Sequence, residues 1–140
     1  MSTRKLTPES MMAKADDACS DARLLLEKGS LDGAVNRAYY AMFAAARSAL
    51  LASNAPVDLN AIRTHKGLIG AFGEHLVKTG LVPKEMGHVL RQTLKVRMTT
   101  DYEGLFVDPE DALTIVNLAK TFAGSMRAKF MPDGGDDEAA

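Results

Sequence analysis

The sequence has little of what several classes of protein need. Its single cysteine, Cys19, excludes an internal disulfide, and its longest mostly apolar run, residues 38–46, is far too short to cross a membrane. No basic and apolar leader opens the chain. These features predict a cytoplasmic protein.

The chain also has no large excess of positive or negative charge. The chain has 17 Lys and Arg against 18 Asp and Glu, so its formal net charge is -1. Nothing in this balance pulls the whole protein toward nucleic acid or anionic lipid. Any contact with nucleic acid must therefore come from a local patch.

The 140 residues are 46% hydrophobic, which suits one compact domain with a real core. The last residues, DGGDDEAA, combine glycine, acid and alanine without a periodic apolar face. We therefore expect a single domain over residues 1–130 and a flexible acidic tail over residues 131–140.

Apolar residues recur at helical spacing along most of the chain, and helix-starting and helix-ending residues divide them into five segments. Thr7-Pro8 and Asp108-Pro109 are typical helix starts, Ser30 is a candidate cap, and Thr79-Gly80 is a typical end. The expected helices cover about residues 8–28, 31–52, 63–78, 83–100 and 109–126. Short connections favour antiparallel neighbours, so the sequence predicts an all-α, up-and-down antiparallel bundle of about five helices.

Several standard chemistries have no counterpart in the sequence. There is no Walker loop, no dinucleotide fingerprint after a strand, no cysteine pair and no His-Glu-x-x-His helix. The three histidines are isolated, and Cys19 lies on an apolar helix face, where a buried, inert thiol is expected. We therefore expect neither a metal nor another cofactor.

The second expected helix carries a polar group within an apolar face. In NRAYYAMFAAARSALL, Arg37 and Tyr40 are three residues apart and share a face, whereas Tyr39 lies on another. Arg37 and Tyr40 could bind a nucleotide or RNA. Alternatively, both tyrosines are core or interface aromatics with hydroxyls at the rim.

The third expected helix begins with basic residues and carries a stripe of glycines. Arg63, His65 and Lys66 lie near the positive end of the helix dipole and could bind a phosphate, or they could form a solvated basic end. Glycines recur every third residue, at positions 67, 70 and 73, and would let a second backbone pack closely.

The stretch KVRMTTDYEG ends the fourth expected helix. Arg97 and Asp101 are four residues apart, so they could form a surface ion pair worth roughly 0.3 to 0.5 kcal/mol. They could instead form a site with Tyr102, because Arg binds phosphate, Asp can accept a proton and Tyr can stack on a base. Such a trio suits a nucleotide or an RNA phosphodiester.

The order AVNRAYYAMFAAARSALL, THKGLIGAFGEHLVKTG and LRQTLKVRMTTDYEG resembles the HEPN domain family, the higher-eukaryote and prokaryote nucleotide-binding domains. The resemblance covers roughly residues 24–122. It is closest to small stand-alone prokaryotic members, similar to HepT, that are often encoded beside a minimal nucleotidyltransferase.

The resemblance implies a helical homodimer with a shared polar cleft, acting as the toxin of a toxin–antitoxin pair and cleaving RNA without a metal. Arg97, Asp101 and Tyr102 would then be the catalytic residues. A minimal nucleotidyltransferase antitoxin would modify Tyr102. The alternative is a non-catalytic dimer of the same kind that binds a nucleotide or a protein.

One departure from the family pattern matters for the chemistry. The nuclease motif of the family has a histidine four to six residues after its arginine, but Asp101 and Tyr102 occupy that region here. Asp101 would be a poor general acid at neutral pH unless burial raised its pKa. His65 could replace the missing histidine only if the fold brings the start of its helix beside Arg97.

Overall fold

The computed structural model describes residues 6–103 and 106–131, with side chains described for residues 6–99 and 106–131. The helices are α1 (Pro8–Glu27), α2 (Leu31–Ala52), α3 (His65–Phe72), α4 (Lys84–Glu103) and α5 (Pro109–Phe130), and a π-helical turn, η1 (Gly73–Val77), continues α3. The described residues contain no strand, which confirms the all-α prediction. The tail expected over residues 131–140 lies outside the described residues from position 132 onward.

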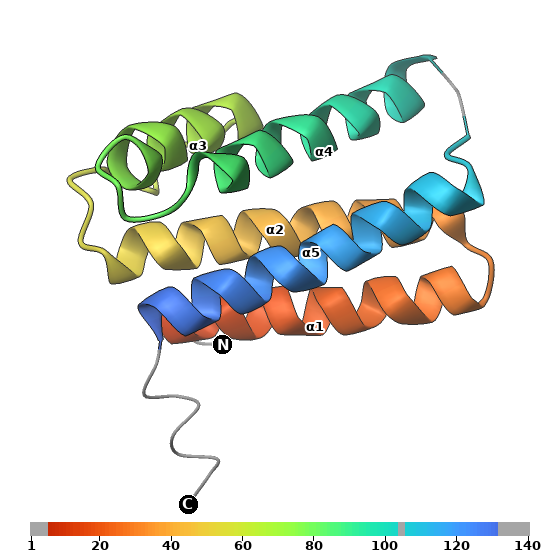
Figure 1. Cartoon of the computed structure of the whole chain (residues 1–140), viewed down its shortest axis with the longest axis horizontal. Coiled ribbons are helices and arrows are strands. Elements are labelled where there is room, and N and C mark those ends of the chain that lie inside the picture. The colour runs from red at the N-terminus through yellow and green to blue at the C-terminus, as the bar shows by residue number, and fades with distance from the viewer. Residues whose placement is uncertain (1–5, 104–105, 132–140) are drawn as a thin grey trace, which may run out of the picture.

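Helix α2 lies at the centre of the bundle. It packs against α1 and α5 on one side and against α3 and α4 on the other (Figure 1). In Figure 1, α1 and α4 run in one direction while α2 and α5 run in the other. The predicted up-and-down arrangement is therefore present, and none of the described helices is both long and apolar enough to span a membrane.

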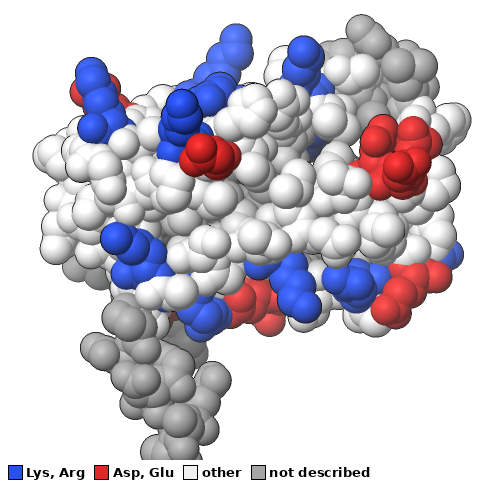
Figure 2. All heavy atoms as spheres, in the orientation of Figure 1, with Lys and Arg blue, Asp and Glu red and all other residues white. Residues whose placement is uncertain are grey.

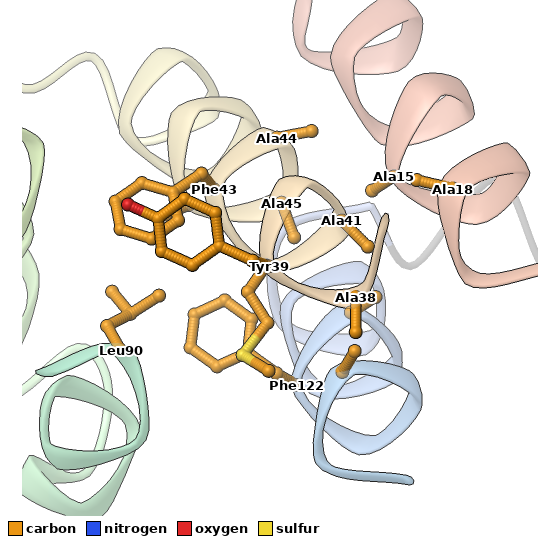
Figure 3. Close-up of a cluster of buried hydrophobic side chains, with 14 of the residues drawn as sticks. Ala15, Ala18, Ala38, Tyr39, Ala41, Phe43, Ala44, Ala45, Leu90 and Phe122 are labelled. Atoms are coloured by element: carbon orange, nitrogen blue, oxygen red, sulfur yellow. The ribbon is translucent and has the colours of Figure 1, made fainter. Parts of the chain in front are cut away.

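Small side chains bring α1 and α2 close together. Ala15 and Ala18 of α1 face Ala38 and Ala41 of α2, and all four are fully buried (Figure 3). Alanine keeps two helix backbones close and loses no side-chain entropy in a helix. The largest fully buried side chains come from all the helices, and they include Met12, Met42, Leu50, Phe72, Leu76, Leu90 and Phe122.

The predicted third helix is not one uninterrupted α-helix. The Lys78 amide donates to the Gly73 carbonyl at 2.8 Å, five residues back, so the last turn is wider than an α-helical turn. Glycines at positions 70 and 73 weaken the helical preference here. Gly80, at φ +83°, ends the segment as expected.

The glycine stripe on α3 is not covered by a second backbone within the described chain. A Cβ placed on Gly70 or Gly73 would meet no atom within 4 Å. At Gly67, a Cβ would come within 3.0 Å of the Thr64 hydroxyl, which caps the same helix. Close packing therefore concerns only Gly67, and it is local.

The expected caps are present at two of three helix starts. Asp108 accepts from the Asp111 amide at 2.9 Å, and Thr7 and Ser10 form a reciprocal capping box. Ser30 precedes α2 as expected, but its side chain makes no capping hydrogen bond. Asp32 in the first turn of α2 instead accepts from the Val107 amide at 3.2 Å, which ties α2 to the segment before α5.

Replacing Thr7 with alanine should lower the free energy of unfolding by about 1 kcal/mol, because the Ser10 amide loses its acceptor at 3.0 Å. Urea denaturation followed by circular dichroism would measure the loss. Ser20→Ala is the matched control, since Ser20 is exposed on α1 and does not cap it. Equal stabilities of the two variants would contradict a stabilising role for this cap.

Candidate functional site

A polar cluster forms where α2, α3 and α4 meet. On α2, residues 36, 39 and 43 are spaced three and four apart and therefore lie along one face. In Figure 3, Tyr39 and Phe43 project from α2 away from the face that packs on α1. Residues from α3 and α4 pack against this face of α2, which carries Asn36, Tyr39 and Phe43.

Arg97, on α4, contacts this face of α2. Its Nε donates a hydrogen bond to the Asn36 side-chain oxygen at 3.2 Å, and its guanidinium carbon lies 4.6 Å from the centre of the Tyr39 ring. A cation over an aromatic face is attractive, and the hydrogen bond orients the planar guanidinium. Arg97 is half-buried while Asn36 is exposed, so solvent reaches the cluster from one side.

His65, at the first position of α3, contacts the same face of α2. Its ring meets the Tyr39 ring edge-on at 4.9 Å between centres and the Phe43 ring at 5.0 Å. The Thr64 hydroxyl accepts from the Gly67 amide at 2.9 Å and so fixes the start of α3. The fold therefore brings the start of α3 beside Arg97. This is the condition under which His65 could replace the histidine that is missing after Arg97.

Arg47 fastens the loop that leads into α3. From α2, its guanidinium donates to the backbone carbonyls of Leu59 and Ile62 at 3.5 and 3.4 Å. These bonds tie residues 59–62 to α2, immediately before His65. The position of His65 thus depends on a residue of α2 that precedes it by 18 positions in the chain.

The surroundings of His65 disfavour its charged form. Partial burial lowers its pKa below the ordinary 6.5, and the positive charges of Arg97 and Arg47 lower it further. The imidazole is therefore mainly neutral at neutral pH, with one ring nitrogen able to accept a proton.

Tyr39 is a buried phenol at the centre of the cluster. Burial raises its pKa to about 12, against the opposing influence of Arg97, so it remains protonated at neutral pH. Its side chain is only 3% exposed, and its hydroxyl makes no hydrogen bond of standard geometry with any residue in the described ranges. Such a donor is costly to leave unpaired, and it lies among groups that suit an anion.

The other predicted binding residues have different surroundings. Arg37 does lie over the Tyr40 ring, 4.8 Å from its centre, as their spacing predicted, and it pairs with Asp21 of α1 at 3.5 Å. Tyr40 is 40% exposed. Arg37 thus pairs with α1, whereas Arg97 contacts Asn36 and Tyr39 on another face of α2.

Arg63 and Lys66 are exposed on either side of His65 in the chain. They place positive charge at the start of α3, which fits both a phosphate-binding end and a solvated basic end. The backbone of α4 continues through Asp101 and Tyr102, but the side chains of residues 100–103 lie outside the described part of the structure. Their predicted catalytic roles remain predictions.

Figure 2 shows charged side chains of both signs along the upper and lower margins of this view, with mostly uncharged surface between them. On this face no broad basic surface is visible, in keeping with the net charge of -1.

A groove of about 650 Å³ between α1 and α5 shares no residue with this cluster. Its lining includes Cys19, Leu24, Lys120 and Gly124. Burial raises the pKa of the Cys19 thiol, and the nearby Lys120 opposes this rise. The thiol therefore stays protonated at neutral pH, but it is half-buried at a groove and not fully buried as the sequence predicted.

Sequence reasoning missed four residues of the cluster as site residues: Asn36, Tyr39, Phe43 and Arg47. The regular spacing of the first three on one face of α2 was a usable signal, but Tyr40 was preferred over Tyr39. Nothing local marked Arg47, because its partners are backbone carbonyls in a loop.

Comparison with known proteins matches residues 8–128 to the HEPN domain. A UPF0332 protein of Gloeobacter violaceus is 37% identical over 101 residues, which span 71% of this chain and 76% of that protein. A UPF0332 protein of Thermotoga maritima is 38% identical over 89 residues, or 64% of each chain. A protein of Methanocaldococcus jannaschii named "Putative toxin" is 29% identical over 119 residues, or 85% of each chain.

Proposed function

The chain belongs to the HEPN domain family, and from this premise we propose that it is the toxin of a toxin–antitoxin pair and cleaves RNA without a metal ion. Two similar proteins of Methanocaldococcus jannaschii are each named "Putative toxin", which supports the toxin role. The observation that carries the proposal is the guanidinium of Arg97, held by Asn36 over Tyr39 and beside His65.

In the proposed reaction, the ribose 2′-hydroxyl attacks the adjacent phosphate of an RNA strand. Negative charge grows on the phosphate oxygens, and the Arg97 guanidinium is suited to bind two of them. Asn36 keeps that guanidinium in one orientation, so little reorganisation is needed as the charge develops. Arg63 and Lys66 would attract the flanking phosphates.

We further propose that the protein acts as a homodimer and that a minimal nucleotidyltransferase is its antitoxin. Arg97 is partly open to solvent, so a second subunit could complete the cleft around it. The antitoxin would transfer a nucleotidyl group to Tyr102. A bulky, negatively charged group at that position would repel an RNA phosphate from Arg97.

The proposal is tested by expressing the chain alone and with its genomic neighbour. Alone, it should arrest growth and shorten cellular RNA. With a neighbouring nucleotidyltransferase, growth should recover and the intact mass of the chain should rise by whole nucleotidyl groups. Tyr102→Phe is the control, because it removes the acceptor oxygen and should abolish the mass increase.

Intact RNA in cells that express the chain at high level would contradict the nuclease. An unchanged mass in the rescued cells would contradict only the proposed modification.

A second function is favoured by the lack of a histidine four to six residues after Arg97. In that case the dimer binds a nucleotide or a protein without turning it over. Binding would depend on Arg97 and Tyr40, and RNA would stay intact. Calorimetry with adenine nucleotides, followed by analysis of the recovered ligand, separates binding from turnover.

A further inference from the structure

If the chain cleaves RNA as proposed above, the reaction needs a group that removes the proton of the 2′-hydroxyl. We propose that His65, at the start of α3, is this proton-accepting catalytic residue and acts on the phosphodiester bound by Arg97. The proposal deepens the proposed function, because it assigns to the site a base that comes from a different helix than the arginine.

The first support is position. His65 and Arg97 both contact the ring of Tyr39, at 4.9 Å between ring centres and at 4.6 Å from guanidinium carbon to ring centre. A phosphate bound by the guanidinium would therefore have the imidazole close by. A 2′-hydroxyl lies next to its own phosphate, so the two groups can act on neighbouring atoms of one nucleotide.

The second support is the way His65 is held. Two aromatic rings meet it edge-on, Thr64 caps the helix on which it sits, and Arg47 ties down the preceding loop. A base positioned in this way loses little entropy when substrate binds. At the same time the His65 side chain is exposed to solvent, so RNA can approach it.

The third support is charge. Among the described residues, the charged and titratable groups that act on or contact His65 are Arg97 from α4 and Arg47 and Tyr39 from α2, and its own segment adds Arg63 and Lys66. Arg97 and Arg47 lower the pKa of His65 along with burial, whereas Tyr39 stays neutral. A neutral imidazole can accept a proton at neutral pH, which a protonated one cannot.

The fourth support is the buried Tyr39 hydroxyl. Its oxygen lies near enough to Arg97 to accept from that guanidinium, but its proton has no acceptor among the described residues. A phosphate oxygen or ribose oxygen would satisfy this donor, whereas a second cation would not. Tyr39 is therefore suited to bind the substrate rather than to take its proton.

The proposed step balances without any other reactant. A ring nitrogen of His65 accepts the 2′-hydroxyl proton as the 2′-oxygen bonds to phosphorus, and the bond from phosphorus to the 5′-oxygen breaks. The 5′-oxygen takes a proton from water, and the imidazolium returns its proton to solvent. The products are a 2′,3′-cyclic phosphate and a 5′-hydroxyl end.

The test uses the purified full-length chain and RNA extracted from the cells whose growth it arrests. His65→Asn should slow cleavage about 100-fold or more at pH 7, the usual contribution of a general base. The wild-type rate should fall as the pH drops below 6.5, where His65 becomes protonated, and this fall should vanish in the variant. Added imidazole should restore part of the activity of His65→Ala, because free imidazole can enter the space.

His88→Asn is the matched control, since His88 is an exposed histidine on α4 whose contact is with Gln92. It should keep the wild-type rate and pH profile. If His65→Asn unfolds at a lower temperature than the wild-type chain, His65→Gln takes its place, because glutamine is closer to histidine in side-chain volume.

Four results are informative. Slow cleavage by the His65 variants with rescue by imidazole supports the proposal. A His65→Asn rate within threefold of wild type, with the same acid limb, overturns it while the proposed nuclease function stands. Intact RNA with the wild-type chain overturns both, and cleavage of 2′-O-methylated RNA would exclude the step written above.

Discussion

Replacing Arg97 with alanine should lower RNA cleavage about 100- to 1,000-fold and abolish growth arrest, because the developing phosphate charge loses its preorganised partner. The fold should survive. Among its interactions, the guanidinium donates a hydrogen bond to Asn36 and contacts the Tyr39 ring, and each of these two is worth about 1 kcal/mol at a partly exposed site. Cleavage rate, growth and thermal melting measured together would separate lost chemistry from lost stability.

Arg91→Ala is the matched control for this experiment, since Arg91 is exposed on the same helix and precedes Arg97 by less than two turns. It should leave growth arrest unchanged. Arg97→Lys should recover little activity, because an ammonium cannot bind two phosphate oxygens in the plane of a guanidinium. A folded Arg97→Ala variant that still arrests growth would remove Arg97 from the mechanism.

Replacing Phe122 with alanine should lower the free energy of unfolding by about 3 to 5 kcal/mol. Phe122 is 1% exposed and its ring lies 5.7 Å from that of fully buried Phe72, so the change opens a cavity between α5 and α3. Denaturant unfolding measures the loss. Because α3 carries His65, the cavity should also weaken RNA cleavage at temperatures where the bundle is still folded.

Phe106→Ala serves as the control, because Phe106 is 89% exposed and the same atoms are removed without a cavity. It should change stability by less than about 0.5 kcal/mol. Equal losses for the two variants would mean that the ring contact between α3 and α5 contributes nothing to the fold.

The helices themselves could be read from the sequence. Thr7-Pro8 and Asp108-Pro109 start α1 and α5 as expected. Caps and apolar periodicity act within one or two turns, so they are visible in a short stretch of residues. The π-helical end of α3 was not foreseen, because it depends on a local shift to hydrogen bonds that reach five residues back.

The candidate site was predicted only in part. Arg97 was named from its motif and His65 from the basic start of its helix, but Tyr40 was preferred to Tyr39. The two tyrosines are adjacent in sequence, yet Tyr39 is 3% exposed and Tyr40 is 40% exposed. Adjacent residues on a helix differ by about 100° in direction, so the choice between them depends on where the neighbouring helices pack.

The sequence by itself determined the helical class, the approximate helix ends and the presence of an arginine suited to phosphate. Only the tertiary structure decided that this arginine meets Asn36, 61 residues away, and that His65 lies against the same tyrosine. The reason is that helical spacing constrains residues up to about two turns apart, whereas contacts between helices depend on how loops return the chain and which faces exclude water.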